Sequence, residues 1–297
     1  MSEKNMTALI SCFLKAYHFE NCHPAIFRDN LAKTILTPEE YQNIILNLSS
    51  GIKYFNPSIV DTNEKVLRWI VNHELSPSVL GRSAFCEDSL YKAYLLGCRQ
   101  YLIFASGYDT FAYRYPIKNL HIFELDLKEM IQDKQSRLTK AKLNNPLVSY
   151  ISCDLTTNDW PNCLITSSYQ KNSLSFSSLL GISYYLTKKE FTTLIKNISL
   201  LVSPGSTIIF DYPIKNNKNE KLQNLAKASG NPMKSTYNYQ EIKTILAAYN
   251  FLIYEHHTAK TIEKIYFKNY NEKNSHDTII PPSNVNYCLA VKNPLQK

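Results

Sequence analysis

The sequence predicts an α/β fold in which helices cover both faces of a doubly wound, mostly parallel sheet. Two observations support this prediction. Apolar residues recur at helical spacing through the first part of the chain, and from residue 100 short apolar runs typical of buried parallel strands alternate with further helical segments. Strands that alternate with helices in this way indicate a doubly wound sheet rather than a barrel or a sandwich.

Helices are expected first along the chain. Residues 7–20, 61–74 and 87–97 carry apolar side chains at helical spacing, and Gly97 is a natural end for the last of these segments. Pro38 is expected in the first turn of another helix, where its missing N–H leaves no hydrogen bond unmade, with Thr37 as the N-cap.

Strands are expected from residue 100 onward. The helix after the fourth strand has the clearest signals, because Thr187 and Glu190 have the spacing of a capping box and Pro204-Gly205 ends the apolar pattern. The predicted strands are residues 101–105, 121–126, 148–152, 174–180, 206–210, 251–254 and 285–291.

Further segments complete this prediction. A helix is expected to follow the second strand as far as about Lys142, and another over residues 239–249. A basic helix with a solvated face is expected to begin near Lys215. The polar, proline-containing stretch 268–284 is expected to be a loop between the last two strands.

Composition excludes several classes of function. Only 7 of the 297 residues are glycine, whereas an average protein has about 7%. They form neither a G-x-G-x-x-G dinucleotide fingerprint nor a G-x-x-x-x-G-K-[ST] phosphate loop. The net charge is +8, but the lysines are scattered, so we do not expect a nucleic-acid partner.

Cysteine usage and hydropathy point to a soluble protein. The 7 cysteines form no C-x-x-C pair and no Cys/His spacing of the zinc type, so no metal site is expected. Free cysteines are typical of a reducing compartment. No apolar run resembles a signal peptide or approaches the roughly 20 residues of a membrane span. We therefore expect a cytoplasmic protein that does not bind membranes; the sequence carries no signal for an oligomeric state.

Three strand ends carry residues that suit a ligand, which in an open parallel sheet binds beyond the carboxyl ends of the strands. The first strand runs into residues 105–109 (Ala-Ser-Gly-Tyr-Asp), the second ends at Asp126 and the third at Asp154-Leu155. A carboxylate can accept both hydroxyls of a ribose, and an Asp-Leu pair suits adenine. These residues predict an adenosyl ligand without phosphates, although Asp126 also fits the role of a cap on the next helix.

At these residues the chain resembles the leucine carboxyl methyltransferase-like family of S-adenosylmethionine (SAM) dependent methyltransferases, in particular its bacterial small-molecule O-methyltransferase branch. The most specific matches are residues 107–114 (Gly-Tyr-Asp-Thr-Phe-Ala-Tyr-Arg) and 180–187 (Leu-Gly-x-x-Tyr-Tyr-Leu-Thr). The matching blocks, whose order and spacing together carry the resemblance, are residues 8–36, 81–88, 100–114, 123–134, 154–160, 179–186, 204–212 and 230–232.

The resemblance implies a fold and a cofactor. The fold is the class I SAM-dependent methyltransferase type, with an antiparallel last strand and an N-terminal helical cap. We expect one domain over residues 1–297, with the cap region at 1–97 and a Rossmann-like SAM-binding core at 98–297. The cofactor is SAM.

The resemblance also implies roles for individual residues. Arg82 would pair with the carboxylate of SAM. Asp126, with Glu124 close by, would hold the ribose, and Asp154 and Leu155 would bind the adenine.

The loop after the first strand contains the family's cofactor-binding turn. Gly107 and Asp109 belong to this turn, but where the family has Gly-Ala-Gly this chain has Ala105 at the first position, which adds a methyl group beside the cofactor. The position after Leu179 is glutamate in the leucine carboxyl branch, and Leu180 here favours a small-molecule enzyme.

The predicted activity is transfer of a methyl group from SAM to an oxygen of a small-molecule acceptor, in enzyme class EC 2.1.1. A carboxylate acceptor is favoured because it is ionised above a pKa of about 4 and needs no base, whereas no His/Asp pair is apparent. A hydroxyl acceptor stays open, and no catalytic residue is assigned. His18, Tyr108 and Tyr184 are candidates for the substrate pocket, although a histidine on a helix face is more often structural.

Two other functions stay open. Ala105 motivates a protein that keeps the methyltransferase fold, binds SAM weakly or not at all, and serves as a binding or regulatory partner. RNA methylation is a third reading, and it predicts that RNA binding depends steeply on salt.

Overall fold

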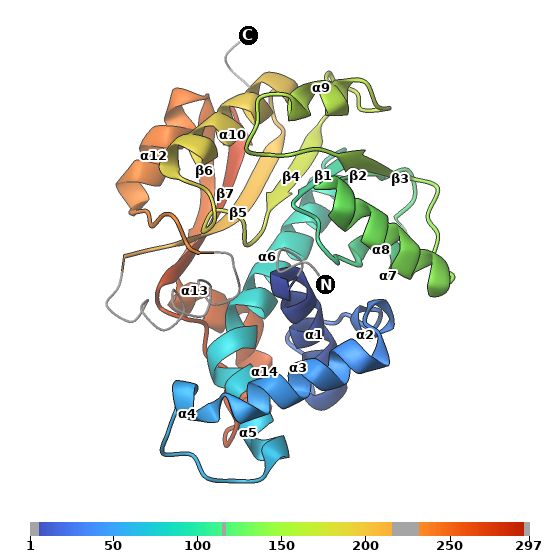
Figure 1. The fold of residues 1–297 in the computed structure, drawn as a ribbon. Helices are drawn as coiled ribbons and strands as arrows, with labels where there is room; N and C mark the ends of the chain where they lie inside the picture. The colour runs from blue at the N-terminus through green and yellow to red at the C-terminus, as the bar shows by residue number, and fades with distance from the viewer. Residues whose placement is uncertain (1–5, 115–116, 216–231, 294–297) are drawn as a thin grey trace.

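The computed structural model describes residues 6–114, 117–215 and 232–293, and the strands in this part of the chain form one sheet (Figure 1). The strands are β1 (Gln100–Phe104), β2 (His121–Asp126), β3 (Val148–Ser152), β4 (Ser175–Leu179), β5 (Thr207–Pro213), β6 (Phe251–His257) and β7 (Val285–Lys292). Their order is β3-β2-β1-β4-β5-β7-β6. β1 to β5 are parallel, whereas β7 is antiparallel to both β5 and β6. The mostly parallel sheet with an antiparallel last strand is therefore confirmed.

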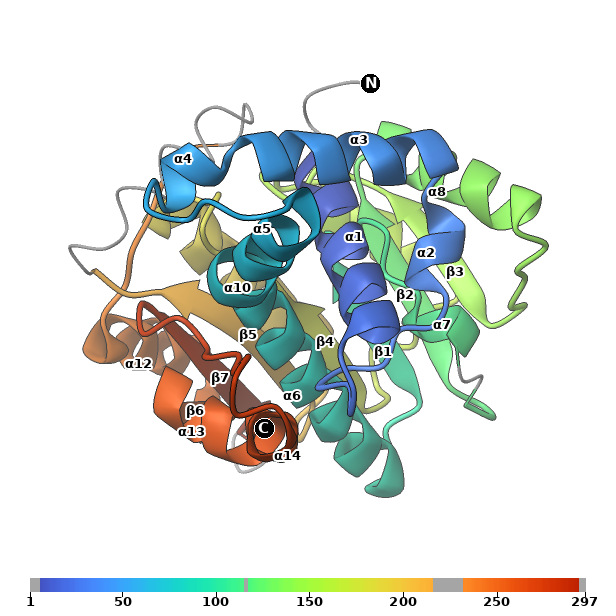
Figure 2. The ribbon, with the colours of Figure 1, turned by 90° about the horizontal axis from the view of Figure 1, so that it is seen from below.

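Side chains alternate between two apolar cores, one on each face of the sheet. In β1, Tyr101 and Ile103 point into one core, and Leu102 and Phe104 point into the other. The first core is covered by α1 (Met6–Asn21), α6 (Ser76–Leu95) and α8 (Lys128–Lys140), and the second by α9 (Trp160–Ile165), α10 (Lys188–Leu201) and α12 (Tyr239–Ala248). The helices thus lie on both faces, as a doubly wound sheet requires, and Figure 2 shows α1 and α6 in front of the strands.

The N-terminal region is helical, as predicted. Between α1 and α6 lie α2 (Ala32–Ile35), α3 (Pro38–Ser50), α4 (Ile52–Phe55), α5 (Asn63–Ile70) and a π-helical segment, η2 (Val71–Leu75). Thr37 caps α3: its side chain accepts from Glu40 N while the Glu40 carboxylate accepts from Thr37 N. α10 and α12 begin with the same arrangement, which confirms the capping box predicted at Thr187.

α6 begins at Ser76, so the prediction that this helix starts near residue 87 is wrong. The polar residues around Gly81 hide the helical pattern, but Leu80 and Phe85 are buried on the helix face that packs on the sheet. A glycine in mid-helix normally costs stability. Here a Cβ on Gly81 would lie 3.0 Å from Ile262 and 3.1 Å from the Tyr287 hydroxyl, so close packing explains the residue.

The segment between β6 and β7 is partly helical, so the loop predicted over residues 268–284 is wrong at its start. α13 (Ala259–Ile262), a π-helical segment η3 (Glu263–Phe267) and α14 (Lys268–Lys273) follow β6. Phe267 and Tyr270 anchor this segment because their rings are buried against the rest of the protein. A short helix α7 (Phe111–Arg114) follows the β1 loop.

Some predictions fall outside the described residues. The basic helix expected to begin near Lys215 and the Gly230 of the last matching block lie outside them. None of the helices in the described part of the chain combines the length and the apolar character needed to cross a lipid bilayer.

Candidate cofactor and substrate site

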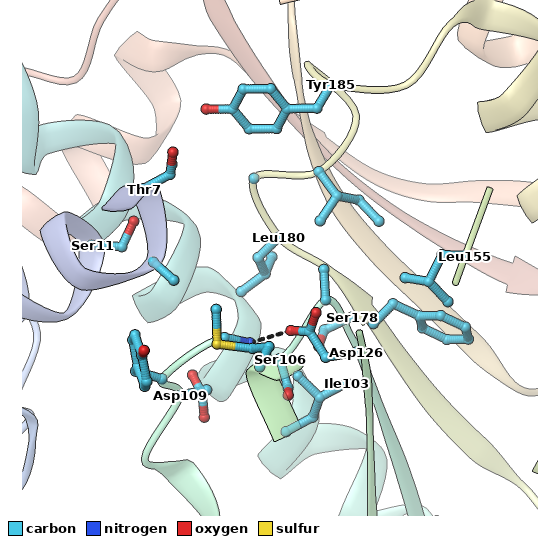
Figure 3. A pocket seen from close by; sticks show the side chains of 18 of the residues that line it. Thr7, Ser11, Ile103, Ser106, Asp109, Asp126, Leu155, Ser178, Leu180 and Tyr185 are labelled. Carbon is cyan, nitrogen blue, oxygen red and sulfur yellow. Dashed lines mark hydrogen bonds between the residues drawn. The ribbon is translucent and has the colours of Figure 1, made fainter. Parts of the chain in front are cut away.

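A cavity of about 530 Å³ lies at the carboxyl ends of β1, β2 and β4, between the sheet and helices α1 and α6 (Figure 3). This is the edge of an open parallel sheet where ligands bind. The helical side of the cavity is formed by Thr7, Ala8, Ser11, Cys12 and Lys15 of α1 and by Val79, Arg82 and Ser83 of α6. The cavity therefore lies where the strand ends predicted it, and α1 covers it.

The loop after β1 forms the floor of the cavity. Ala105 and Gly107 both line it, and both have left-handed backbone conformations, with φ of 53° and 48°. A Cβ on Gly107 would lie 3.3 Å from the Cβ of Ala8 in α1. Glycine at this position thus lets the loop and α1 lie close together where both line the cavity.

Asp126 ends β2 with its carboxylate at the cavity. One carboxylate oxygen accepts from Gly107 N at 2.8 Å, as the dashed line in Figure 3 shows, and the other accepts from Leu127 N at 2.8 Å. Burial raises the pKa of the Asp126 carboxyl, against the lowering effect of these two N–H groups. Each carboxylate oxygen can accept a second hydrogen bond, so Asp126 can still bind two hydroxyl groups of a ligand.

Asp154 and Leu155 follow β3 and also line the cavity. The Asp154 carboxylate accepts from Thr156 N at 2.9 Å and from the Thr156 hydroxyl at 2.7 Å. This local turn fixes the backbone, and Leu155 then lies across the cavity from Thr7 and Ser11 (Figure 3). The turn provides an apolar wall on which a flat ring can pack.

Lys15 of α1 brings a buried positive charge to the cavity, and we predicted no site role for it. Its Nζ lies 3.5 Å from Asp109 Oδ2 and 3.4 Å from Asp29 Oδ2. Burial raises the pKa of the Asp109 carboxyl, but the positive charges of Lys15, Lys134 and Arg114, with the Phe111 N–H, together outweigh burial and hold this pKa below its ordinary value. The ion pair joins α1 to the loop that carries Gly107.

Arg82 of α6 is a second cation at the cavity, as predicted. Its Nη1 lies 3.5 Å from Oδ2 of Asp211 in β5, and its side chain is 16% exposed. Burial lowers the pKa of the Arg82 guanidinium, but Asp211 and the tyrosines around it together outweigh burial and raise this pKa. Arg82 therefore presents a permanent positive charge to the cavity.

Glu124 does not line the cavity, unlike the other residues expected to bind the cofactor. It lies two residues before the end of β2, inside the sheet, where its fully buried carboxylate pairs with the equally buried Lys134 of α8. Burial raises the pKa of the Glu124 carboxyl in spite of this partner. Asp126, on the same face of the strand but at its tip, reaches the ligand side.

Of the three residues expected in a substrate pocket, only Tyr108 lines the cavity. His18 lies at the far end of α1, past the turns that face the cavity, and its Nε2 accepts from Ile26 N at 2.8 Å. Burial lowers the pKa of His18 to about 3, so this histidine is neutral. Tyr184 is buried and donates to Asp211 at 2.9 Å, whereas its neighbour Tyr185 lines the cavity.

A family comparison decides what this site belongs to. Residues 8–199, which include every strand end around the cavity, match the model of the family described as leucine carboxyl methyltransferase.

The chain belongs to the leucine carboxyl methyltransferase family.

Comparison with individual proteins agrees. "Putative S-adenosyl-L-methionine-dependent methyltransferase YktD" of Bacillus subtilis is 36% identical, over 98% of this chain and 99% of its own. Two crystal structures show the same fold. A DUF574 family protein from Streptomyces avermitilis gives a TM-score of 0.62 at 10% identity, over 96% of this chain and 97% of its own. The magnesium protoporphyrin IX methyltransferase of Synechocystis, with bound S-adenosylhomocysteine, gives a TM-score of 0.50 at 10% identity, over 85% of this chain and 99% of its own.

As a member of the leucine carboxyl methyltransferase family, the protein is a SAM-dependent methyltransferase, and SAM is its cofactor. The cavity has the chemistry that this cofactor requires. It offers a carboxylate at the tip of β2 for a diol, an apolar wall at Leu155 for a purine, and Arg82 as a cation for a carboxylate. No phosphate has to be held, which agrees with the absence of glycine-rich phosphate loops from the sequence.

Several residues that line the cavity were not predicted as site residues. They come from segments that only the tertiary structure brings to the strand ends, and they are Thr7, Ser11 and Lys15 of α1, Met130 of α8, Tyr185 and Lys234. One signal was available for α1: Thr7, Ser11 and Lys15 are spaced four residues apart and form a polar stripe on an otherwise apolar helix.

Proposed function

We propose that the protein transfers the methyl group of SAM to an oxygen atom of a small-molecule acceptor, and that this oxygen belongs to a carboxylate. SAM supplies an electrophilic methyl group when bound. The protein has to place the acceptor oxygen in line with that group and to exclude water from it. α1 covers the cavity and is suited to both tasks.

We assign the cofactor contacts to the strand ends. Asp126 would hold the two ribose hydroxyls, because its oxygens keep acceptor capacity on the cavity side. Asp154 and Leu155 would bind the adenine, with the leucine against the ring. Arg82 would pair with the cofactor carboxylate, as a guanidinium donates two parallel hydrogen bonds to such a group.

The absence of a free base at the cavity supports a carboxylate acceptor. No histidine is among the described residues that line it, and its aspartates already have partners. Asp109 is paired with Lys15, and Asp126 and Asp154 accept from backbone N–H groups. A hydroxyl acceptor must lose its proton to a base, whereas a carboxylate with a pKa of about 4 is already ionised at neutral pH.

The stability of the product toward alkali tests this proposal. The protein is incubated with SAM labelled in its methyl group and with the low-molecular-mass fraction of a bacterial extract, and the products are treated with alkali. A methyl ester hydrolyses and releases volatile labelled methanol, whereas a methyl ether survives. We expect volatile label that depends on the protein and is suppressed by excess S-adenosylhomocysteine.

Two results would contradict the proposal. Label that resists alkali would rule out a carboxylate acceptor. A protein that binds S-adenosylhomocysteine but labels nothing in the extract would favour a binding or regulatory role, the function that Ala105 motivates.

A further inference from the structure

A buried aspartate behind the cavity wall organises the residues around Arg82. Asp211 lies in the middle of the sheet on β5, is fully buried and does not itself line the cavity. Its carboxylate accepts from Gly181 N at 2.7 Å, from the Tyr184 hydroxyl at 2.9 Å and from Arg82 Nη1 at 3.5 Å. One carboxylate therefore connects β5, the loop after β4 and α6.

Gly181 is required where it stands for two reasons. Its φ is +68°, a conformation that favours glycine. A Cβ at this position would also lie 2.7 Å from Nη1, 2.8 Å from Cζ and 2.8 Å from Nη2 of Arg82. The guanidinium therefore lies directly against the Gly181 backbone, and any side chain there would displace it.

The remaining donors of Arg82 have no partner among the residues that the structure describes. A guanidinium carries several N–H groups, and among the described residues only Asp211 accepts from this one. The side chain is 16% exposed, and Arg82 lines the cavity. A cation held from behind, with unused donors toward a cavity, is a site for a carboxylate.

We propose that Asp211 is a positioning residue that, together with Gly181, holds the Arg82 guanidinium in the orientation that binds the carboxylate of the cofactor. The inference rests on the assignment of Arg82 under the proposed function, and it adds the residues that hold the Arg82 side chain in place. Tyr184 takes part by donating to the same carboxylate.

The binding of two ligands distinguishes a positioning role of Asp211 from a general structural role. S-adenosylhomocysteine carries the amino-acid carboxylate, whereas 5′-methylthioadenosine has the same adenosine and sulfur without the amino acid. Asp211→Asn keeps the shape of the side chain but removes its charge and turns an N–H₂ group toward Arg82. We expect Asp211→Asn to weaken the binding of S-adenosylhomocysteine about tenfold or more. The affinity for 5′-methylthioadenosine should stay within about twofold of the wild-type value, as measured by titration calorimetry.

Gly181→Ala reaches Arg82 by a different route. It changes no charge, but its methyl group would displace the guanidinium, so the same selective loss of S-adenosylhomocysteine is expected. Asp277→Asn is the matched control. Asp277 also accepts from an arginine, Arg68 Nε at 2.7 Å, and from a tyrosine, Tyr270, but does not line the cavity. Its loss should change neither affinity.

A double variant tests whether Asp211 and Arg82 act on the same ligand contact. Arg82→Gln alone should match Asp211→Asn, and the two together should lose no more than Arg82→Gln alone, because both act on one contact. Equal loss of both ligands in Asp211→Asn would overturn the proposal, and so would unchanged binding of S-adenosylhomocysteine. Should Asp211→Asn fail to fold, Gly181→Ala and Arg82→Gln decide the same question.

Both titrations are made without an acceptor. A result that contradicts the role of Asp211 is therefore distinguishable from one that contradicts methyl transfer, because the alkali treatment tests methyl transfer separately. If Arg82→Gln leaves both affinities unchanged while wild-type protein still forms methyl esters, the role of Arg82 is wrong and the reaction stands.

Discussion

Ala105 follows β1 in the left-handed region of backbone conformation, with a φ of 53°. A non-glycine residue in this region loses roughly 1–2 kcal/mol because its Cβ is crowded by the backbone. The family that the chain resembles has glycine here. The backbone of the cofactor loop therefore keeps the conformation that glycine would allow, and the alanine methyl group sits beside the cavity with a strain cost.

Ala105→Gly is expected to stabilise the protein. Relief of the left-handed strain exceeds the extra freedom that glycine gives the unfolded chain, so the free energy of unfolding should rise by up to about 1 kcal/mol. Urea unfolding measures this change. Ala93→Gly, in the regular helix α6, is the control and should lower the same quantity by about 1 kcal/mol. A loss of stability in Ala105→Gly would contradict the strain.

The predictability of the site differs from residue to residue. Asp126 and Leu155 could be predicted because they end strands, and the ends of parallel strands meet at one edge of the sheet. Asp211 could not, since its position depends on how β5 packs against that edge, and for Lys15 the sequence offers only the polar stripe on α1, which does not show what the stripe faces. Glu124 was predicted beside the cofactor from its proximity in sequence to Asp126, but its side chain is paired with Lys134 inside the sheet and does not line the cavity.

At the scale of elements, α1 is connected to the cofactor loop by buried charges. Lys15 pairs with Asp109 of the loop and with Asp29, and Asp29 also accepts from the Thr110 hydroxyl at 2.6 Å. The cover of the cavity and its floor are thus joined by one network.

This network predicts an acid-dependent stability. The pKa of Asp109 is held below its ordinary 3.8, so the pairing stabilises the fold above about pH 4 and this contribution is lost as pH falls through the lowered folded-state value. Lys15→Met removes the cation that contributes most to this lowering of the Asp109 pKa. The difference in unfolding free energy between wild type and Lys15→Met should therefore be larger at pH 6 than at pH 2.5, by urea unfolding.

Lys65→Met is the control for the stability measurement on Lys15→Met. Lys65→Met removes the partner of Asp61 in an exposed pair, where the Lys65 side chain is 71% accessible, and should change stability little at either pH. A difference for Lys15→Met that is the same at both pH values would show that the Lys15 charge does not act through Asp109.

Elements with strong local signals could be predicted, and those fixed by packing could not. The capping boxes at Thr37 and Thr187 and the largely apolar strand β1 need only their own residues. The first turns of α6 carry Gly81, a residue that is unfavourable inside a helix, and close packing against Tyr287 explains its presence there. α14 looks polar, and only burial of Tyr270 reveals why it is helical.

At the scale of the whole molecule, the predicted cap region and the predicted core share α6. This helix lies wholly within residues 1–97, where it packs against α1 and η2, but it also contacts β4 and β5 of the sheet. We therefore expect the two regions to unfold together in a single transition. Differential scanning calorimetry should give equal calorimetric and van't Hoff enthalpies, whereas two separated transitions would show that the cap region is a domain of its own.

Cofactor binding at the tips of β1 and β2 is tested most directly by titrating S-adenosylhomocysteine into wild-type protein and Asp126→Asn. Wild type should bind, and Asp126→Asn should bind about tenfold or more weakly because the paired hydroxyl acceptors are lost, with the exposed Asp159→Asn as an unchanged control. Equal affinities would remove Asp126 from the ribose site. No binding by wild type at millimolar ligand would contradict the assignment of this cavity to SAM.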